Sequence, residues 1–143
     1  MDTLAVKMQT IDDKTMFSAV TRENPEIVID FFPPAGTGKG YTSLELLMVS
    51  LGTCVSTTLI SFLRFKMDKS INGVSAEMNG TVCEKHPKKL NKISLFLKVI
   101  AEDLTEDELQ DALKVVENKI CPVWAMIKGN VTVDVKTEIC LPK

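Results

Sequence analysis

Residues 44–67 read LELLMVSLGTCVSTTLISFLRFKM. No charged residue stands between Leu46 and Leu63, and this run is almost long enough to cross a bilayer. It also contains several hydroxyl side chains, each of which would need a hydrogen-bond partner in hydrocarbon. They are Ser50, Thr53, Ser56, Thr57, Thr58 and Ser61. We therefore expect a long helix that is buried within protein on most sides, and no membrane span.

Cys54 shares one face of this expected helix with polar side chains. Ser50 precedes it by four residues, and Thr57, Thr58 and Ser61 follow it at helical spacing. Their hydroxyls can bond back to helix carbonyls, which would be a purely structural role, or they can line a small site that contains the thiol. Taken alone, a thiol in the middle of an apolar helix is expected to be unreactive, because desolvation raises its pKa.

Length and composition predict one globular domain over residues 1–143. Hydrophobic residues make up 45% and charged residues 25% of the chain, and the formal net charge is −2. This balance gives no basis for a nucleic acid or an anionic membrane as partner. The start of the chain carries Asp2 and no apolar targeting segment, so we expect a cytoplasmic protein.

The four cysteines are expected to be reduced in that compartment and not to form a structural disulfide framework. Cys83 and His86 have the spacing of metal ligands, but a structural zinc site needs four ligands and no second pair exists. The glycine-rich stretch 33–40 lacks the Gly-Lys-Ser/Thr ending of a phosphate-binding loop. We expect no metal and no bound cofactor, and we assign no role to Cys140.

The remaining pattern predicts grouped strands and helices. Residues 105–108 form a capping box that starts a second helix ending near Lys119, and a new helix starts at Pro122. Strands are expected at Leu4–Gln9, Met16–Thr21, Ile27–Phe32, Val74–Cys83, Lys92–Ile100 and Val131–Ile139, and a turn at Ser70–Gly73. Because strands and helices do not strictly alternate, we predict an α+β fold with mainly antiparallel sheets.

Cys121 precedes Pro122 and is therefore expected to cap a helix N-terminus. Free backbone N–H groups there would lower its thiol pKa, so the residues alone favour Cys121 as the more reactive cysteine. Arg22 and Arg64 are the only arginines. Arg22 is a candidate for stabilising a thiolate, whereas Arg64 lies too far along the helix from Cys54. Glu45 projects from the opposite side of a straight helix.

Three stretches together resemble the OsmC/Ohr family. Residues 43–54, SLELLMVSLGTC, are similar to its P-x-E-L-L-L-x-x-L-G-x-C signature, with Ser43 in place of proline. The His86-Pro87 pair before a strand, and Asp103-Leu104 before a helix that ends in CPV at 121–123, occur in the family's order and spacing. Glu45 matches the glutamate of the osmotically inducible and less characterised branches. The arginine motif of the hydroperoxide-resistance branch is missing, so Arg22 is a candidate by position only.

The resemblance implies an α+β fold with a long central helix packed on antiparallel sheets, and an intertwined homodimer with sites at its interface. It implies that Cys54 attacks an organic or inorganic hydroperoxide and becomes a sulfenic acid. Cys121 then attacks the sulfenic acid, and a disulfide forms. A dithiol reductant, which is either a small molecule or a lipoyl- or thioredoxin-type protein, reduces this disulfide back to two thiols. Glu45 would orient the guanidinium that tunes the thiolate. The resemblance therefore makes Cys54 the reactive cysteine, whereas the residues alone favour Cys121.

Two other functions remain open at this point. A dimeric small-molecule-binding protein could use the same interface pocket for an apolar ligand, with incidental thiols. A redox sensor could pass its disulfide to another protein. A binding protein needs no cysteine with a lowered pKa, which separates it from the thiol peroxidase.

Overall fold

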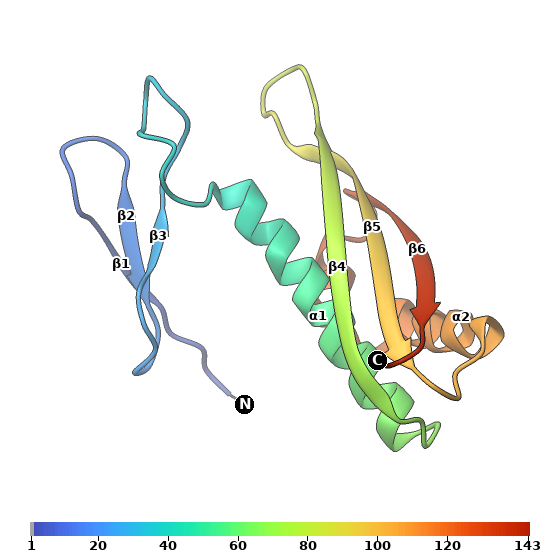
Figure 1. Ribbon diagram of the computed structural model, residues 1–143. Helices are drawn as coiled ribbons and strands as arrows, with labels where there is room; N and C mark the ends of the chain where they lie inside the picture. Colours follow the sequence, from blue (N-terminus) through green and yellow to red (C-terminus); the bar gives the residue numbers. More distant parts are fainter. Residues whose placement is uncertain (1) are drawn as a thin grey trace. The chain divides into compact units, whose positions relative to one another are not determined.

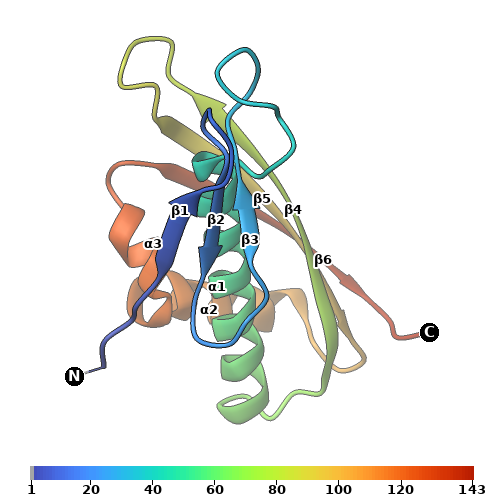
Figure 2. The same cartoon turned by 90° about the vertical axis from the view of Figure 1, so that its left-hand side faces the viewer.

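The computed structural model describes residues 2–143, which form two compact units divided between Leu47 and Met48. The first unit holds a three-stranded antiparallel sheet of β1 (Lys7–Thr10), β2 (Phe17–Val20) and β3 (Ile27–Ile29), with β2 in the middle (Figure 2). Phe17 pairs with Ile29, and Ala19 with Ile27, so these apolar side chains share one face. The three predicted strands are confirmed, although each is shorter than its sequence pattern.

A buried carboxylate organises the loop that follows β3. Asp30 accepts hydrogen bonds from the Thr37 hydroxyl (2.6 Å) and backbone N–H (2.8 Å), from the Thr15 hydroxyl (2.8 Å) and from the Phe31 N–H (2.7 Å). The Thr37 bonds are the largest cause that holds the pKa of Asp30 far below its usual range. The loop also passes close to its own backbone at Gly36, where a Cβ would lie 2.3 Å from the Phe31 carbonyl oxygen.

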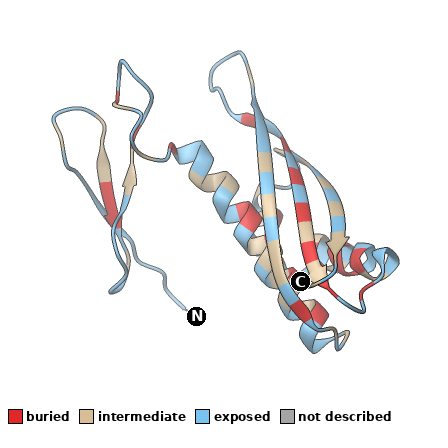
Figure 3. Ribbon diagram, in the orientation of Figure 1, coloured by how far each residue is buried: buried red, intermediate tan, exposed pale blue. Residues whose placement is uncertain are grey.

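The second unit contains a mixed three-stranded sheet with β5 (Leu90–Ala101) between β4 (Ile71–Val82) and β6 (Thr132–Cys140), as Figure 1 shows. β4 pairs antiparallel and β6 parallel to β5. Burial alternates along β5, where Ile93, Leu95, Leu97 and Val99 are buried (Figure 3). The turn predicted at Ser70–Gly73 is wrong. β4 already begins at Ile71, and a register shift at Asn72 interrupts the regular pairing there.

The long helix is α1, Ser43–Phe65, which begins in the first unit and continues in the second. Its buried residues Leu51, Val55, Leu59 and Leu63 recur every fourth position and so form one stripe. Gly52 allows a close approach to β4, because a Cβ there would lie 2.7 Å from the Met78 sulfur. The predicted helix is confirmed, and it ends two residues earlier than the sequence pattern indicated.

Three consecutive helical segments connect β5 to β6. α2 (Glu106–Val115) begins with the predicted capping box between Thr105 and Glu108, and it buries Leu109, Ala112 and Leu113. A π-helical turn, η1 (Val116–Ile120), continues directly from it and ends at Cys121. The short helix α3 (Pro122–Ile127) then starts at the predicted proline. The α+β fold with two three-stranded sheets and a long helix therefore agrees with the sequence prediction, whereas the homodimer stays a prediction.

α1 is a long apolar helix of which much remains exposed. By length and composition it could cross a membrane, with a mean hydropathy of 1.9, a test that a core helix of a soluble protein also passes. Only 28% of that apolar window is buried. Val49 is exposed, and Phe65 is 83% exposed. The expectation that protein surrounds this helix on most sides is therefore not met by one chain.

Candidate active site

Cys54 lies in the middle of α1 and is half-buried. One turn further on, the hydroxyl of Thr58 donates to the Cys54 carbonyl oxygen at 2.8 Å. The hydroxyl of Thr53 similarly bonds back to the Val49 carbonyl at 2.8 Å. Both hydroxyls are therefore used within the helix, and Thr58 has the purely structural role foreseen for the hydroxyls that share the face of Cys54. The thiol itself remains partly accessible.

Cys121 lies at the junction between η1 and α3 and is only 2% exposed. Its backbone N–H donates to the Val116 carbonyl at 2.9 Å, which closes the π-turn. Its sulfur accepts a hydrogen bond from the Trp124 backbone N–H at 3.4 Å, so the thiol is the N-cap of α3. Two backbone contacts thus fix both the chain and the side chain of Cys121.

The side chains of Cys54 and Cys121 lie near enough to each other to interact electrostatically. Burial raises the pKa of Cys121 to about 11, and the neighbouring Cys54 adds to the rise, while the Trp124 N–H opposes it. The expectation that the helix N-terminus lowers the pKa of Cys121 is therefore wrong. Removal of the thiol from water outweighs the effect of a six-residue helix. At neutral pH Cys121 is a protonated thiol beside Cys54.

Glu45 interacts with Thr42 at the start of α1. Its Oε1 accepts from the Thr42 N–H at 2.8 Å, and its own N–H donates to the Thr42 hydroxyl at 3.2 Å. This reciprocal pair is a capping box for α1. The carboxylate therefore anchors the start of the helix that carries Cys54. A role in orienting a guanidinium stays a prediction.

The two arginines differ in their surroundings. Arg64 donates from Nη2 to the Ile71 carbonyl at 2.7 Å, so it ties the end of α1 to the start of β4. Arg22 is exposed, in a turn after β2, with a positive φ of 55°. Its role as the activating arginine stays a prediction.

The other candidate residues lie apart from the cysteine pair. Cys83 and His86 belong to the loop between β4 and β5, where His86 is exposed. Cys140 ends β6, opposite Ile100 of β5. Within residues 2–143 no group of three or more His, Cys, Asp or Glu side chains could hold a metal ion. The residue that sequence analysis missed is Asp30. Its signal was an acidic residue between an apolar strand and a glycine-rich loop.

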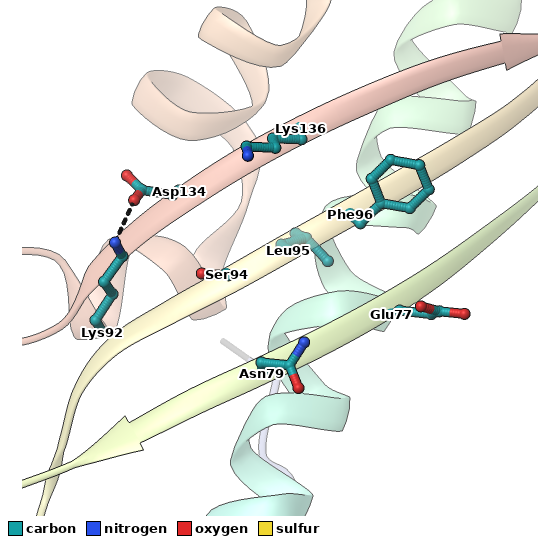
Figure 4. A pocket seen from close by; sticks show the side chains of 8 residues that line it. All are labelled: Glu77, Asn79, Lys92, Ser94, Leu95, Phe96, Asp134 and Lys136. Atoms are coloured by element: carbon teal, nitrogen blue, oxygen red, sulfur yellow. Dashed lines mark ion pairs between the residues drawn. The ribbon is translucent and has the colours of Figure 1, made fainter.

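A shallow hollow of about 200 Å³ lies on the outward face of the β4–β5–β6 sheet (Figure 4). An ion pair of 2.9 Å between Lys92 and Asp134 crosses two of its strands. Both partners are about half exposed, so this pair contributes little stability. The hollow is lined by Glu77, Asn79, Lys92, Ser94, Leu95, Phe96, Asp134 and Lys136. Neither Cys54 nor Cys121 belongs to it.

Comparisons with known proteins found one matching family and several similar solved structures. Residues 36–136 match the family model described as OsmC-like protein. A hypothetical protein from Aquifex aeolicus has a similar structure, with 25% sequence identity over 100% of both chains and a TM-score of 0.84. The OsmC-like protein from Mycoplasma pneumoniae is 19% identical over 99% of both chains, with a TM-score of 0.78.

The organic hydroperoxide resistance protein OhrB of Bacillus subtilis is 15% identical, over 96% of this chain and 98% of that one, with a TM-score of 0.68. At this identity the likeness concerns the fold alone. No curated protein matches the sequence. The family match covers the start of α1, both cysteines and most of the β4–β5–β6 sheet.

Proposed function

The chain belongs to the OsmC-like protein family, and from that premise we propose that it is a thiol-dependent peroxidase that reduces organic hydroperoxides. Solved structures of this fold include organic hydroperoxide resistance proteins from Legionella pneumophila and Bacillus subtilis. The observation that carries the proposal is the proximity of Cys54 and Cys121, which lie far apart in the sequence. A partly accessible thiol beside a buried one suits a nucleophile with a resolving partner.

In the proposed cycle Cys54 is the nucleophile. Its thiolate attacks the distal oxygen of the hydroperoxide, an S–O bond forms, and the O–O bond breaks to release an alcohol. Cys121 then attacks the resulting sulfenic acid, so that a disulfide forms and the oxygen leaves as water. A dithiol reductant returns both cysteines to thiols by disulfide exchange. No metal or bound cofactor takes part in this scheme.

We also propose that the protein works as a homodimer in the cytosol. The support for the dimer is the low burial of α1, since soluble chains rarely leave a helix of such hydropathy largely in contact with water. A second copy of the chain would cover this helix, including its exposed Val49 and Phe65. The cytosol supplies the reductants that the cycle requires.

Stopped-flow mixing of the reduced protein with cumene hydroperoxide tests the proposal. The wild type should consume two thiols per peroxide much faster than free cysteine does. Cys54→Ser should abolish the reaction, and Cys121→Ser should stop at a Cys54 sulfenic acid that a dimedone probe traps. Cys83→Ser is the matched control and should behave as wild type. Oxidation of the wild type at the rate of free cysteine would exclude the peroxidase function.

A further inference from the structure

We propose that Lys128 is a positioning residue for Cys121, because it clamps the π-turn η1 to the end of α3 and so holds the resolving thiol in its buried place. The existence of this clamp follows from hydrogen bonds at the junction between the two helical segments. Its consequence for the reaction rests on the proposed peroxidase function.

The ammonium group of Lys128 bridges the junction that carries Cys121. It donates to the Glu117 carboxylate and to the side-chain oxygen of Asn118, each at 2.9 Å. Asn118 is itself fixed, because its amide nitrogen donates to the Lys114 carbonyl at 2.9 Å. Both acceptors belong to η1, whereas the donor directly follows α3. One side chain therefore joins the residues before Cys121 to the residue after the next helix.

The bridge depends on a bend in the chain at Cys121. In a continuous α-helix, the eleven positions from Glu117 to Lys128 would span about 16 Å along the axis, which is too far for these two side chains to meet. Cys121 instead has an extended backbone, with φ −82° and ψ 106°, and turns the chain between η1 and α3. The clamp therefore favours the bent junction over a straighter one.

The bent junction determines where the Cys121 sulfur lies. The π-turn lets the Cys121 N–H reach the Val116 carbonyl at 2.9 Å, and the sulfur accepts from the Trp124 N–H at 3.4 Å. Val116 and Trp124 are buried, so packing holds one side of the junction. The side chains of Glu117 and Lys128 are 36% and 48% exposed, so the clamp holds the side that faces solvent.

The proposed cycle needs Cys121 in a defined orientation. Its sulfur attacks the Cys54 sulfenic acid, the S–S bond forms, and the S–O bond breaks to release water, while Lys128 takes no part in these bond changes. A fixed orientation raises the fraction of molecules in which the thiol is ready to attack. Loss of the clamp should slow this step alone. It should also let the junction open more often and expose Cys121 to reagents.

Two measurements on the reduced, full-length protein test this role. In a single turnover with cumene hydroperoxide, rapid acid quenching and mass spectrometry separate the oxidation of Cys54 from the formation of the disulfide. Without peroxide, labelling with N-ethylmaleimide and peptide mapping measure how often Cys121 becomes accessible. The variants are Lys128→Met, Lys128→Arg and the charge swap that combines Glu117→Lys with Lys128→Glu.

We expect Lys128→Met to form the disulfide about two- to fivefold more slowly, and to label Cys121 faster by a similar factor, as suits a partly exposed ion pair. Its rate of Cys54 oxidation should equal that of the wild type. Lys128→Arg and the charge swap should restore both measurements, since each keeps opposite charges at the bridge. High salt should speed Cys121 labelling in the wild type and leave Lys128→Met unchanged.

Lys92→Met is the matched control. It breaks an ion pair of the same 2.9 Å length and similar exposure, on the outward face of the sheet, and should leave both measurements unchanged. Unchanged labelling of Cys121 in Lys128→Met, equal slowing of both chemical steps, or the same effects in Lys92→Met would overturn the clamp. Wild type that oxidises no faster than free cysteine would refute the peroxidase function, and the labelling rates would then decide the clamp by themselves.

Discussion

The backbone N–H of Trp124 donates to the sulfur of Cys121 at 3.4 Å, in the first turn of α3. The preceding π-turn fixes the backbone of Cys121 through its bond to Val116. The buried thiol is thus held from both sides of the junction, beside Cys54. This arrangement and three other features of the fold have measurable consequences.

The first consequence is a loss of stability at alkaline pH. The pKa of Cys121 rises from its ordinary 9.0 to about 11 in the folded protein, chiefly because the thiol is buried. Between these two pH values the Cys121 thiol has lost its proton in the unfolded chain but keeps it in the folded chain. The contribution of this thiol to the stability of the fold is therefore complete below about pH 9 and is lost as the pH approaches 11.

Urea denaturation across this pH range measures the effect. The free energy of unfolding of the wild type should fall relative to Cys121→Ala by on the order of 1–3 kcal/mol. The variant serves as the reference because all other titrating groups are common to both proteins. A difference that stays constant with pH would contradict the raised pKa.

The second consequence concerns Glu45, which caps α1 through Thr42. Glu45→Ala removes the acceptor of the Thr42 N–H and should lower the free energy of unfolding by about 0.5–2 kcal/mol. Glu45→Gln keeps an amide oxygen in the same place and should retain most of that stability. Thermal denaturation of both variants and of Thr42→Ala, as a matched control, measures the cap.

Glu45→Gln also separates the cap from a role in catalysis. If the carboxylate orients an activating guanidinium, this variant should retain its melting temperature and still oxidise Cys54 more slowly with cumene hydroperoxide. An unchanged rate together with an unchanged melting temperature would leave Glu45 as a helix cap only.

The third consequence concerns the loop that Asp30 organises. Hydrogen bonds from Thr37 and Thr15 hold the pKa of Asp30 far below its ordinary 3.8. This carboxylate therefore stabilises the fold at and above that pH, and its contribution is lost as the pH falls below it. Asp30→Ala should lower the melting temperature at neutral pH, with a smaller difference from wild type at pH 3.

Glycine substitutions test the same loop by a second route. Gly36→Ala places a Cβ 2.3 Å from Asp30 Oδ1 and from the Phe31 carbonyl oxygen, so the backbone must move. Gly52→Ala meets only the flexible end of Met78 and is the matched control. We expect a clearly lower melting temperature for Gly36→Ala than for Gly52→Ala, and the reverse order would contradict the described loop.

The fourth consequence concerns the uncovered surface of α1. A charge at an exposed apolar position, as in Val49→Asp or Phe65→Asp, should convert the proposed dimer into a monomer, because a buried unpaired carboxylate opposes association. Sedimentation velocity measures the mass. Ser94→Asp, on the outward sheet face, is the control and should remain dimeric. A wild type that sediments as a monomer would refute the dimer.

The sequence was informative where local rules dominate. The uncharged run after Glu45 correctly predicted the long helix. The Thr105–Glu108 pair predicted the start of α2, and Pro122 predicted the start of α3. These features depend on contacts within a few residues. The alternation of Ile93, Leu95, Leu97 and Val99 similarly identified β5.

Features that depend on distant contacts were not accessible in this way. The π-turn before Cys121 has no residue signature, and the parallel pairing of β6 with β5 depends on where the connecting helices return the chain. The pKa of Cys121 was predicted in the wrong direction because its burial is a property of the packed fold. The contact between Cys54 and Cys121 came from the family resemblance and not from spacing.

The central claim is that Cys54 and Cys121 form one redox pair, and peptide mapping of the oxidised protein tests it most directly. Reduced protein is treated with one equivalent of cumene hydroperoxide, alkylated, digested without reductant and analysed by mass spectrometry. We predict a single intramolecular disulfide between Cys54 and Cys121, with Cys83 and Cys140 recovered as alkylated thiols. A disulfide that involves Cys83 or Cys140, or the recovery of all four cysteines as thiols, would contradict the account.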